Sequence, residues 1–283
     1  MQRAIGNSGL LVGPVGLGGM PLSIEGRPSE HAATEVIEAF LDGGGDFIDT
    51  AISYCLDNGE LGHNERLIAK TLARLGRRDV VVATKGGVTR LDGRWDVDCS
   101  PDSLRRCCER SARDLGEPIP LYYLHTVDPN VPFADSVGEL ARLREQGKIA
   151  AIGLSNVNSR HLDEALAITP IAAVQNRCNV YDRRDFLTGL VERCRQTGVA
   201  YVPYSPAGGH FGHKRLTDDA TLAQLAAKYS TTVQAIAIAW LLAKGPHMLP
   251  IPGATKTSSV ASSLRAGAIT LDAEDLERLD TLR

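Results

Sequence analysis

Short apolar runs rich in valine and isoleucine alternate along this chain with longer stretches in which apolar positions recur every three to four residues. The short runs predict buried β-strands, and the longer stretches predict amphipathic helices. Eight strands are expected, at residues 15–17, 47–49, 80–84, 121–125, 150–153, 172–175, 200–203 and 248–250. A short hairpin, formed by residues 3–5 and 10–12, is expected ahead of the first strand.

Capping residues mark the expected helices. Ser29 precedes a periodic stretch that stops at three consecutive glycines, residues 43–45, and Pro101 occupies the first position of a later helix. Further helices are expected at about residues 64–75, 100–115, 132–146, 159–167, 185–196, 222–229, 233–243, 258–266 and 272–283. The segment between the seventh strand and residue 222 is expected to be a long loop.

Strict alternation of strands and helices implies a parallel sheet. Eight such units in 283 residues favour closure into a (β/α)₈ TIM barrel, for which roughly 250 residues is typical. The linkers are too short to contain a domain boundary. We therefore expect one α/β domain spanning residues 1–283, with an N-terminal hairpin and an extra C-terminal helix.

Charge and composition narrow the function. The net charge is −3 and no basic stripe is visible, so nucleic acid and anionic membranes are not expected partners. The longest apolar run, residues 235–243, is far too short to span a membrane, and no signal peptide is recognised. Six cysteines lack metal-ligand spacing and are expected to be free thiols in a reducing cytoplasm.

Polar residues stand at the ends of three successive strands. Active sites of TIM barrels lie at the C-terminal ends of the strands. The second strand ends at Asp49, with Tyr54 five residues later, the third ends at Lys85 and the fourth at His125. A carboxylate, a phenol, an ammonium and an imidazole are therefore expected at one mouth of the barrel.

These four groups can form a proton-delivery device. Tyrosine titrates near pH 10, and we expect the Lys85 cation to lower the pKa of Tyr54, which then acts as a general acid. Asp49 would keep Lys85 charged, and His125 would donate a hydrogen bond to a carbonyl oxygen. Taken singly, such an aspartate is more often a helix cap and such a histidine a core residue; together they favour the catalytic interpretation.

Two other motifs give weaker evidence of function. Residues 16–19 contain three glycines, but Pro21 occupies the third position of a dinucleotide-binding fingerprint. His210 and His213 could ligate a metal, but no carboxylate or cysteine completes a site, so solvated or substrate-lining histidines are favoured and no metal is expected.

Seven ordered segments of the chain resemble the aldo-keto reductase superfamily: FIDTAISY (47–54), TKGG (84–87), LYYLHTVDP (121–129), GKIAAIGLSN (147–156), AAVQNRCN (172–179), YVPYSPAGG (201–209) and LPIPGA (249–254). The family's catalytic residues fall on Asp49, Tyr54, Lys85 and His125. The resemblance implies an enzyme that reduces aldehydes or ketones with NADPH, reversibly. It is nearest to bacterial reductases of pyridoxal or small aldehydes.

The resemblance also implies a cofactor site. The nicotinamide would be held by Ser155, Asn156, Gln175 and Tyr204. The pyrophosphate would be held by Ser205, Ala207 and Gly209, and the 2′-phosphate by Ala254 and Lys256. A cation at Lys256 favours NADPH over NADH. Relatives often carry an arginine where Ser259 stands and a Glu-Asn pair at Ser262 and Ser263, so the strength of this preference stays open.

The substrate is left open by the sequence. Candidate pocket residues are Met20, Trp95, Thr126, His210 and Phe211. One alternative is an NADP(H)-binding regulatory or redox-sensing subunit with little turnover, and another is a biosynthetic enzyme for a tailored ketone. A monomer or a weak homo-oligomer is expected.

Overall fold

A closed barrel of parallel strands forms the centre of the molecule. The computed structural model describes residues 2–282, except for the side chains of residues 210, 211 and 213. Seven strands follow the order β11-β10-β9-β8-β5-β4-β3. Their bounds are β3 (Leu17–Gly18), β4 (Phe47–Asp49), β5 (Val81–Gly86), β8 (Ile119–Leu124), β9 (Ile149–Ser155), β10 (Ala173–Gln175) and β11 (Ala200–Tyr201).

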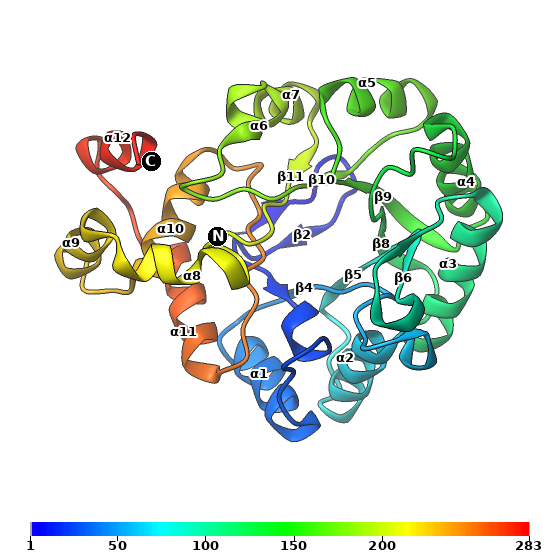
Figure 1. Cartoon of the computed structure of the whole chain (residues 1–283), viewed down its shortest axis with the longest axis horizontal. Helices are drawn as coiled ribbons and strands as arrows, with labels where there is room; N and C mark the ends of the chain where they lie inside the picture. The colour runs from blue at the N-terminus through cyan, green and yellow to red at the C-terminus, as the bar shows by residue number, and fades with distance from the viewer. Residues whose placement is uncertain (1, 283) are drawn as a thin grey trace.

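A short eighth segment closes the barrel. Met248 bridges to Tyr201 in β11, and Gly253 bridges to Gly18 in β3. The two edges of the sheet are thereby joined into a (β/α)₈ barrel, as the alternating pattern predicts (Figure 1).

Helices form a ring around the barrel (Figure 1). Their bounds are α1 (Glu30–Asp42), α2 (His63–Arg74), α3 (Pro101–Leu115), α4 (Phe133–Glu145), α5 (Ser159–Ile168), α6 (Arg184–Leu187), α7 (Leu190–Thr197), α8 (Gly209–Asp218), α9 (Ala220–Lys228), α10 (Val233–Ala243), α11 (Thr257–Arg265) and α12 (Ala273–Asp280). Short 3₁₀ turns are η1 (Met20–Leu22), η2 (Asn58–Glu60), η3 (Leu91–Gly93) and η4 (Ala266–Ala268). The expected caps are present: the Ser29 and Ser100 side chains accept hydrogen bonds from backbone amides in the first turns of α1 and α3.

Two apolar layers stabilise this arrangement. Side chains alternate between the two faces of a strand, so Phe47 and Ala83 point into the barrel while Ile48 and Val82 point outward. The outward residues pack in one cluster with residues of α1 and α2, such as Phe40. Because both faces of the strands are covered, the sequences of the strands are nearly continuous apolar runs.

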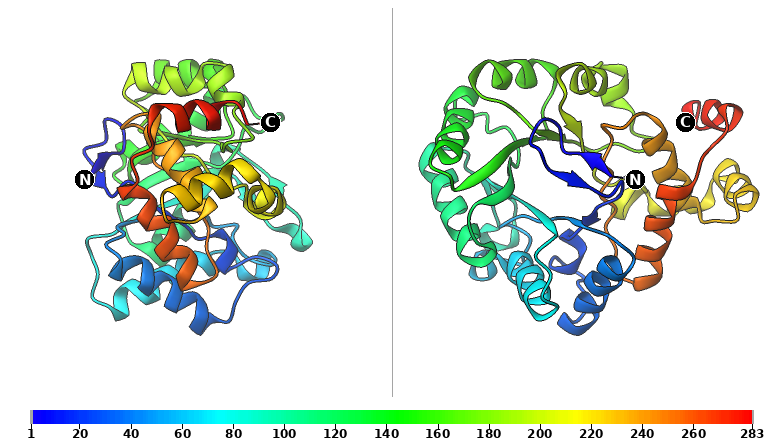
Figure 2. Two further views of the ribbon diagram at one scale, coloured as in Figure 1. Left: turned by 90° about the vertical axis from the view of Figure 1, so that its left-hand side faces the viewer. Right: turned by 180° about the vertical axis from the view of Figure 1, so that it is seen from behind.

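A hairpin closes the N-terminal end of the barrel. Strands β1 (Arg3–Ala4) and β2 (Leu11–Val12) pair antiparallel and lie across that end in the right-hand view of Figure 2. Ile5 and Val12 are fully buried in the inner cluster. Arg3 fixes the hairpin by donating to the carbonyl oxygens of Gly245 and Met248 at 2.7 and 2.8 Å.

Three segments differ from the sequence-based expectation. The long loop expected after β11 contains α8, whose Leu216 is fully buried in the main core cluster and therefore holds a glycine-containing segment as helix. The helix expected over residues 185–196 is divided into α6 and α7 at Gly189, where φ is +80°. A second hairpin, β6 (Val88–Thr89) with β7 (Asp96–Val97), follows β5 and was not predicted.

The apolar content of the helices bears on membrane insertion. Among residues 2–282 no single helix has the length and apolarity to cross a bilayer; α9 and α10 reach that size only as a pair bent by 85°. The bulk of α10 is buried inside the protein.

One acidic side chain lies in the packed layer between the barrel and its helices. Glu65 in α2 is fully buried, and its Oε1 accepts a hydrogen bond of 2.5 Å from Thr84 of β5. Burial raises the pKa of Glu65 to about 7, because the charged form loses its hydration there.

We expect Glu65→Gln to change how stability depends on pH. Between pH 4.5 and about 7 the unfolded Glu65 releases its proton while the folded one retains it, so stability falls as pH rises. The amide has no such cost and should stabilise the protein at pH 8 relative to wild type, by up to about 3 kcal/mol. Urea unfolding at pH 4.5 and pH 8 measures this difference, with the exposed Glu145→Gln as control. An unchanged pH slope in Glu65→Gln would contradict the assignment.

Candidate active site

The four residues predicted to act together meet at the C-terminal end of the barrel. Asp49 ends β4, Lys85 lies near the end of β5, and His125 directly follows β8. These three strands are neighbours in the sheet. Lys85 Nζ donates to Asp49 Oδ2 at 2.6 Å and to the Tyr54 hydroxyl at 2.9 Å. The structure therefore brings three of the four polar groups into direct hydrogen-bond contact.

Lys85 is held as a fully buried cation. Its side chain is 0% exposed, and its third hydrogen bond, of 2.8 Å, goes to the carbonyl oxygen of Thr50. The partner Asp49 also accepts 2.7 Å from Gln175 Nε2 through its second oxygen. Burial lowers the pKa of Lys85 and raises that of Asp49, and the attraction between the two opposes both shifts. A buried ammonium needs this full set of acceptors, because an unpaired charge there would be very costly.

Tyr54 retains its proton in this environment. Burial, reinforced by the negative charge of Asp49, raises the pKa of the phenol well above its usual value. The sequence analysis expected a lowered pKa for Tyr54; in the structure this pKa is raised, because loss of hydration and the charge of Asp49 set its direction. The phenol is consequently protonated at neutral pH, and the Lys85 N–H already points at its oxygen.

His125 completes the group as a neutral imidazole. Its ring lies edge-on to the Tyr54 ring, with centroids 5.8 Å apart and planes at 77°. Burial, and secondly the charge of Lys85, lower the pKa of His125 well below its usual value. Its Nδ1 lies 3.5 Å from the hydroxyl of the buried Ser53. A neutral imidazole carries one N–H, so it can donate a single hydrogen bond at the mouth.

The residues expected at the nicotinamide lie beside this cluster, at the ends of the next three strands. Asn156 donates to the carbonyl oxygen of His125 at 3.0 Å and accepts from the Tyr204 hydroxyl at 2.9 Å. Ser155 donates to the carbonyl oxygen of Gln175 at 2.8 Å. Since Gln175 also donates to Asp49, one hydrogen-bond network joins the two sets of residues.

Backbone conformation distinguishes two of these positions. Asn156 and Ser205 adopt the left-handed conformation, with φ of +58° and +52°. This conformation is uncommon for residues other than glycine, and such residues cluster at functional sites. Ser205 and Ala207 lie ahead of α8, and Gly209 begins that helix.

The predicted 2′-phosphate residues lie on a different side of the mouth. Ala254 is buried next to the bridge between Gly253 and Gly18, and Lys256 is exposed immediately before α11. Ser259 is exposed, whereas Ser262 and Ser263 are buried, with the Ser262 hydroxyl 2.5 Å from that of Thr232. Ser262 and Ser263 are therefore packed within the protein.

Candidate pocket residues are only partly covered. Met20 at η1 is 36% exposed, and Trp95 is 48% exposed with the Arg90 guanidinium 4.2 Å from its ring centre. Thr126 follows His125 and is partly buried. The side chains of the other two candidates, His210 and Phe211, lie outside the described part of the chain, as does that of His213. No group of three or more metal-binding side chains occurs among the residues that are described.

Several residues around the site were missed by the sequence reasoning. Thr50 and Ser53 stand between Asp49 and Tyr54 in the FIDTAISY segment. Their closeness in sequence to two predicted site residues could have identified them. Asn64 contacts the site from α2, accepting from the Thr50 hydroxyl at 2.6 Å. Nothing in the local sequence around Asn64 indicates that contact.

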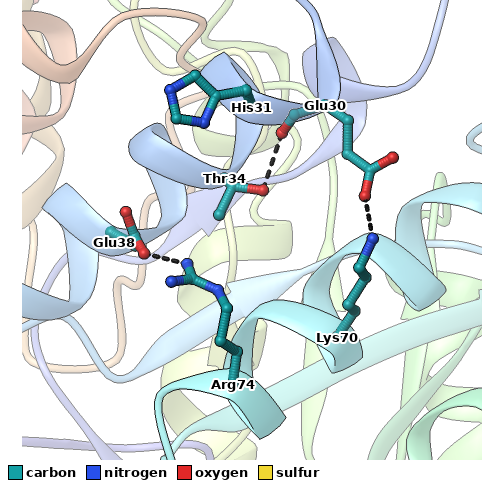
Figure 3. Close-up of a pocket in the computed structure, with 6 residues that line it drawn as sticks. All are labelled: Glu30, His31, Thr34, Glu38, Lys70 and Arg74. Carbon is teal, nitrogen blue, oxygen red and sulfur yellow. Dashed lines mark hydrogen bonds and ion pairs between the residues drawn. The ribbon is translucent and has the colours of Figure 1, made fainter.

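A surface hollow of about 410 Å³ lies elsewhere, between α1 and α2 (Figure 3). It is lined by charged residues that pair across it: Lys70 with Glu30 at 2.5 Å, and Arg74 with Glu38. None of the four predicted catalytic residues lines this hollow. Its charged groups pair with one another at the surface, and its lining residues are all on α1 and α2.

Sequence comparisons relate this chain to the aldo/keto reductases. The model of the aldo/keto reductase family matches residues 14–283. Probable aldo-keto reductase 1 of Glycine max is 33% identical over 97% of this chain and 86% of its own length. Aldo-keto reductase str7 of Strobilurus tenacellus is 32% identical, over 97% and 89%.

Solved structures give the same result for the fold. The thermostable aldo-keto reductase Tm1743, crystallised with the inhibitor epalrestat, superimposes with a TM-score of 0.84 at 28% identity, covering 99% of both chains. An aldo-keto reductase of Klebsiella pneumoniae in complex with NADPH has a TM-score of 0.83 at 24% identity, covering 99% of this chain and 94% of its own. With its barrel, the four polar groups at its mouth and a family match over residues 14–283, this chain belongs to the aldo/keto reductase family.

Proposed function

We propose that this protein is an NADP(H)-dependent oxidoreductase that reduces aldehydes or ketones to alcohols and catalyses the reverse oxidation. The observation that carries the proposal is the hydrogen bonding of one buried ammonium, that of Lys85, to both Asp49 and Tyr54. A buried cation directed at a protonated phenol is suited to stabilising a phenolate after proton transfer.

Tyr54 is the proposed general acid. Its phenol donates a proton to the carbonyl oxygen as negative charge develops there, and Lys85 stabilises the phenolate that results. Asp49 holds Lys85 in its charged form. In the oxidation direction the same phenolate accepts the proton of the alcohol.

His125 is proposed to orient the carbonyl group. Because burial keeps this imidazole neutral, it can donate one hydrogen bond to the substrate oxygen without releasing a competing proton. Its edge-on contact with the Tyr54 ring supports a joint role for the two side chains.

The donor set beside the four residues fits a nicotinamide. Asn156 carries an amide donor and an amide acceptor, the two groups that pair with a carboxamide, and would exchange its bonds to His125 and Tyr204 for bonds to the nicotinamide. The half-buried ring of Tyr204 offers a flat apolar face. Ser155 and Gln175 would hold the same group. When bound, the nicotinamide supplies or accepts the hydride at its C4 carbon.

The remaining cofactor residues follow the rim of the barrel. Ser205, Ala207 and Gly209 would hold the pyrophosphate through backbone N–H groups at the start of α8. Ala254 and Lys256 would meet the 2′-phosphate, where an exposed ammonium has an anion to neutralise.

Substrate would enter over partly exposed apolar side chains. We propose Met20, Trp95 and Thr126 as lining residues, with His210 and Phe211 from the start of α8.

One barrel formed by all eight βα units supports the proposal that residues 1–283 are a single domain.

We expect Tyr54→Phe to separate binding from chemistry. Removing the proton donor should lower the rate of carbonyl reduction by about 10²-fold or more, the usual contribution of a positioned acid. NADPH binding should be nearly unchanged, because the ring remains in place. Steady-state NADPH oxidation and fluorescence titration measure the two effects.

The outcome also tests the regulatory alternative. Near-normal turnover of Tyr54→Phe would show that another group donates the proton. Wild-type protein that binds NADPH yet oxidises none across a panel of aldehydes, ketones, sugars and pyridoxal would instead favour a regulatory subunit.

We expect Lys256→Ala to weaken NADPH binding selectively. Loss of the cation removes an attraction to the 2′-phosphate that NADH lacks, so the dissociation constant should rise by about tenfold for NADPH and change little for NADH. Lys148→Ala is the matched control, because Lys148 precedes β9 and lies at the end of the barrel away from the proposed cofactor site. An equal loss of affinity for both cofactors would contradict the assignment.

A further inference from the structure

Two adjacent residues in the first turn of α2 contact the two strands that carry the catalytic lysine and aspartate. Asn64 and Glu65 are both fully buried. The Thr50 hydroxyl donates to Asn64 Oδ1 at 2.6 Å, and the Thr84 hydroxyl donates to Glu65 Oε1 at 2.5 Å. Thr50 directly follows Asp49, and Thr84 directly precedes Lys85.

The position of the two threonines follows from strand geometry. Side chains alternate across a strand, so Lys85 points into the barrel while Thr84 points outward to the helices. Each threonine is fully buried and lies one residue from a proposed catalytic group. One helix turn therefore contacts both strands from outside, directly behind the site.

The contact of Thr50 reaches the catalytic lysine itself. The carbonyl oxygen of Thr50 accepts a hydrogen bond of 2.8 Å from Lys85 Nζ. Movement of Thr50 would therefore change both the position of Asp49 and the third ligand of the ammonium. Hydrogen bonds in series of this kind reinforce one another in a buried environment.

Asn64 extends the contact to a third strand end. Its Nδ2 donates to the carbonyl oxygen of Gly19 at 2.9 Å and to the Ser23 hydroxyl at 2.8 Å. The backbone N–H of Gly19 donates to the carbonyl oxygen of Asp49 at 2.8 Å. A Cβ at Gly19 would lie 2.4 Å from Asn64 Oδ1, so this approach is possible only for glycine.

From this geometry we infer that Asn64 and Glu65, acting through Thr50 and Thr84, are positioning residues that set the distance between Lys85, Asp49 and Tyr54. The inference rests on the proposed function, since it concerns the same reaction. None of these four residues needs to contact substrate or cofactor.

The test compares isosteric variants of the two threonines. We expect Thr50→Val and Thr84→Val each to lower kcat by about tenfold or more, because small displacements of catalytic groups are costly. The dissociation constant for NADPH should change less than twofold. Thr50→Ser and Thr84→Ser keep the hydroxyl and should restore kcat to near the wild-type value.

A second readout separates positioning from loss of folded protein. In alcohol oxidation the rate depends on the Tyr54 phenolate, which Lys85 stabilises. A displaced Lys85 should move the rising limb of the pH–rate profile to higher pH in the valine variants. Misfolding would only reduce the NADPH-binding fraction, measured by fluorescence titration, and would leave the limb unmoved.

Thr71→Val is the matched control. Thr71 is likewise a buried threonine, but it lies in α2 and its hydroxyl donates at 2.8 Å to the carbonyl oxygen of Leu67 in the same helix. This variant should keep the wild-type kcat and pH profile. The inference is overturned if Thr50→Val and Thr84→Val behave like Thr71→Val, or if the serine variants are as impaired as the valine variants. Wild-type protein without NADPH-dependent reduction would instead refute the proposed function.

Discussion

A single buried ammonium constrains the whole site. Lys85 is completely enclosed, and a charge in that position is tolerable only when every N–H has an acceptor. Asp49, at the end of the neighbouring strand β4, supplies one acceptor. Thr50 and Tyr54, in the segment that follows β4, supply the other two. Strands β4 and β5 therefore have to pair in this register for the group to form.

The sequence predicted the barrel and the four catalytic candidates for a physical reason. Strands buried on both faces are apolar throughout, so polar residues such as Asp49, Lys85 and His125 stand out at the strand ends. Adjacent parallel strands necessarily bring such ends together. The cap at Ser29 and the helix start at Pro101 could be predicted equally well, since both depend on neighbouring residues alone.

What could not be predicted depends on contacts distant in sequence. The helix α8 forms because Leu216 packs into the core, although its segment contains glycines. The contact between Asn64 and Thr50 joins a helix to a strand end. The pKa of Tyr54 is raised rather than lowered, because its sign depends on how completely the phenol is buried, which only the packed structure determines.

The N-terminal hairpin has a consequence for the exchange of bound molecules. Its buried Ile5 and Val12 fill the end of the barrel that faces away from Lys85. Under the proposed function, cofactor and substrate would share the opening at the other end, because side chains also fill the interior of the barrel. Residues 3–12 therefore leave that exchange to the loops at the opposite end of the protein.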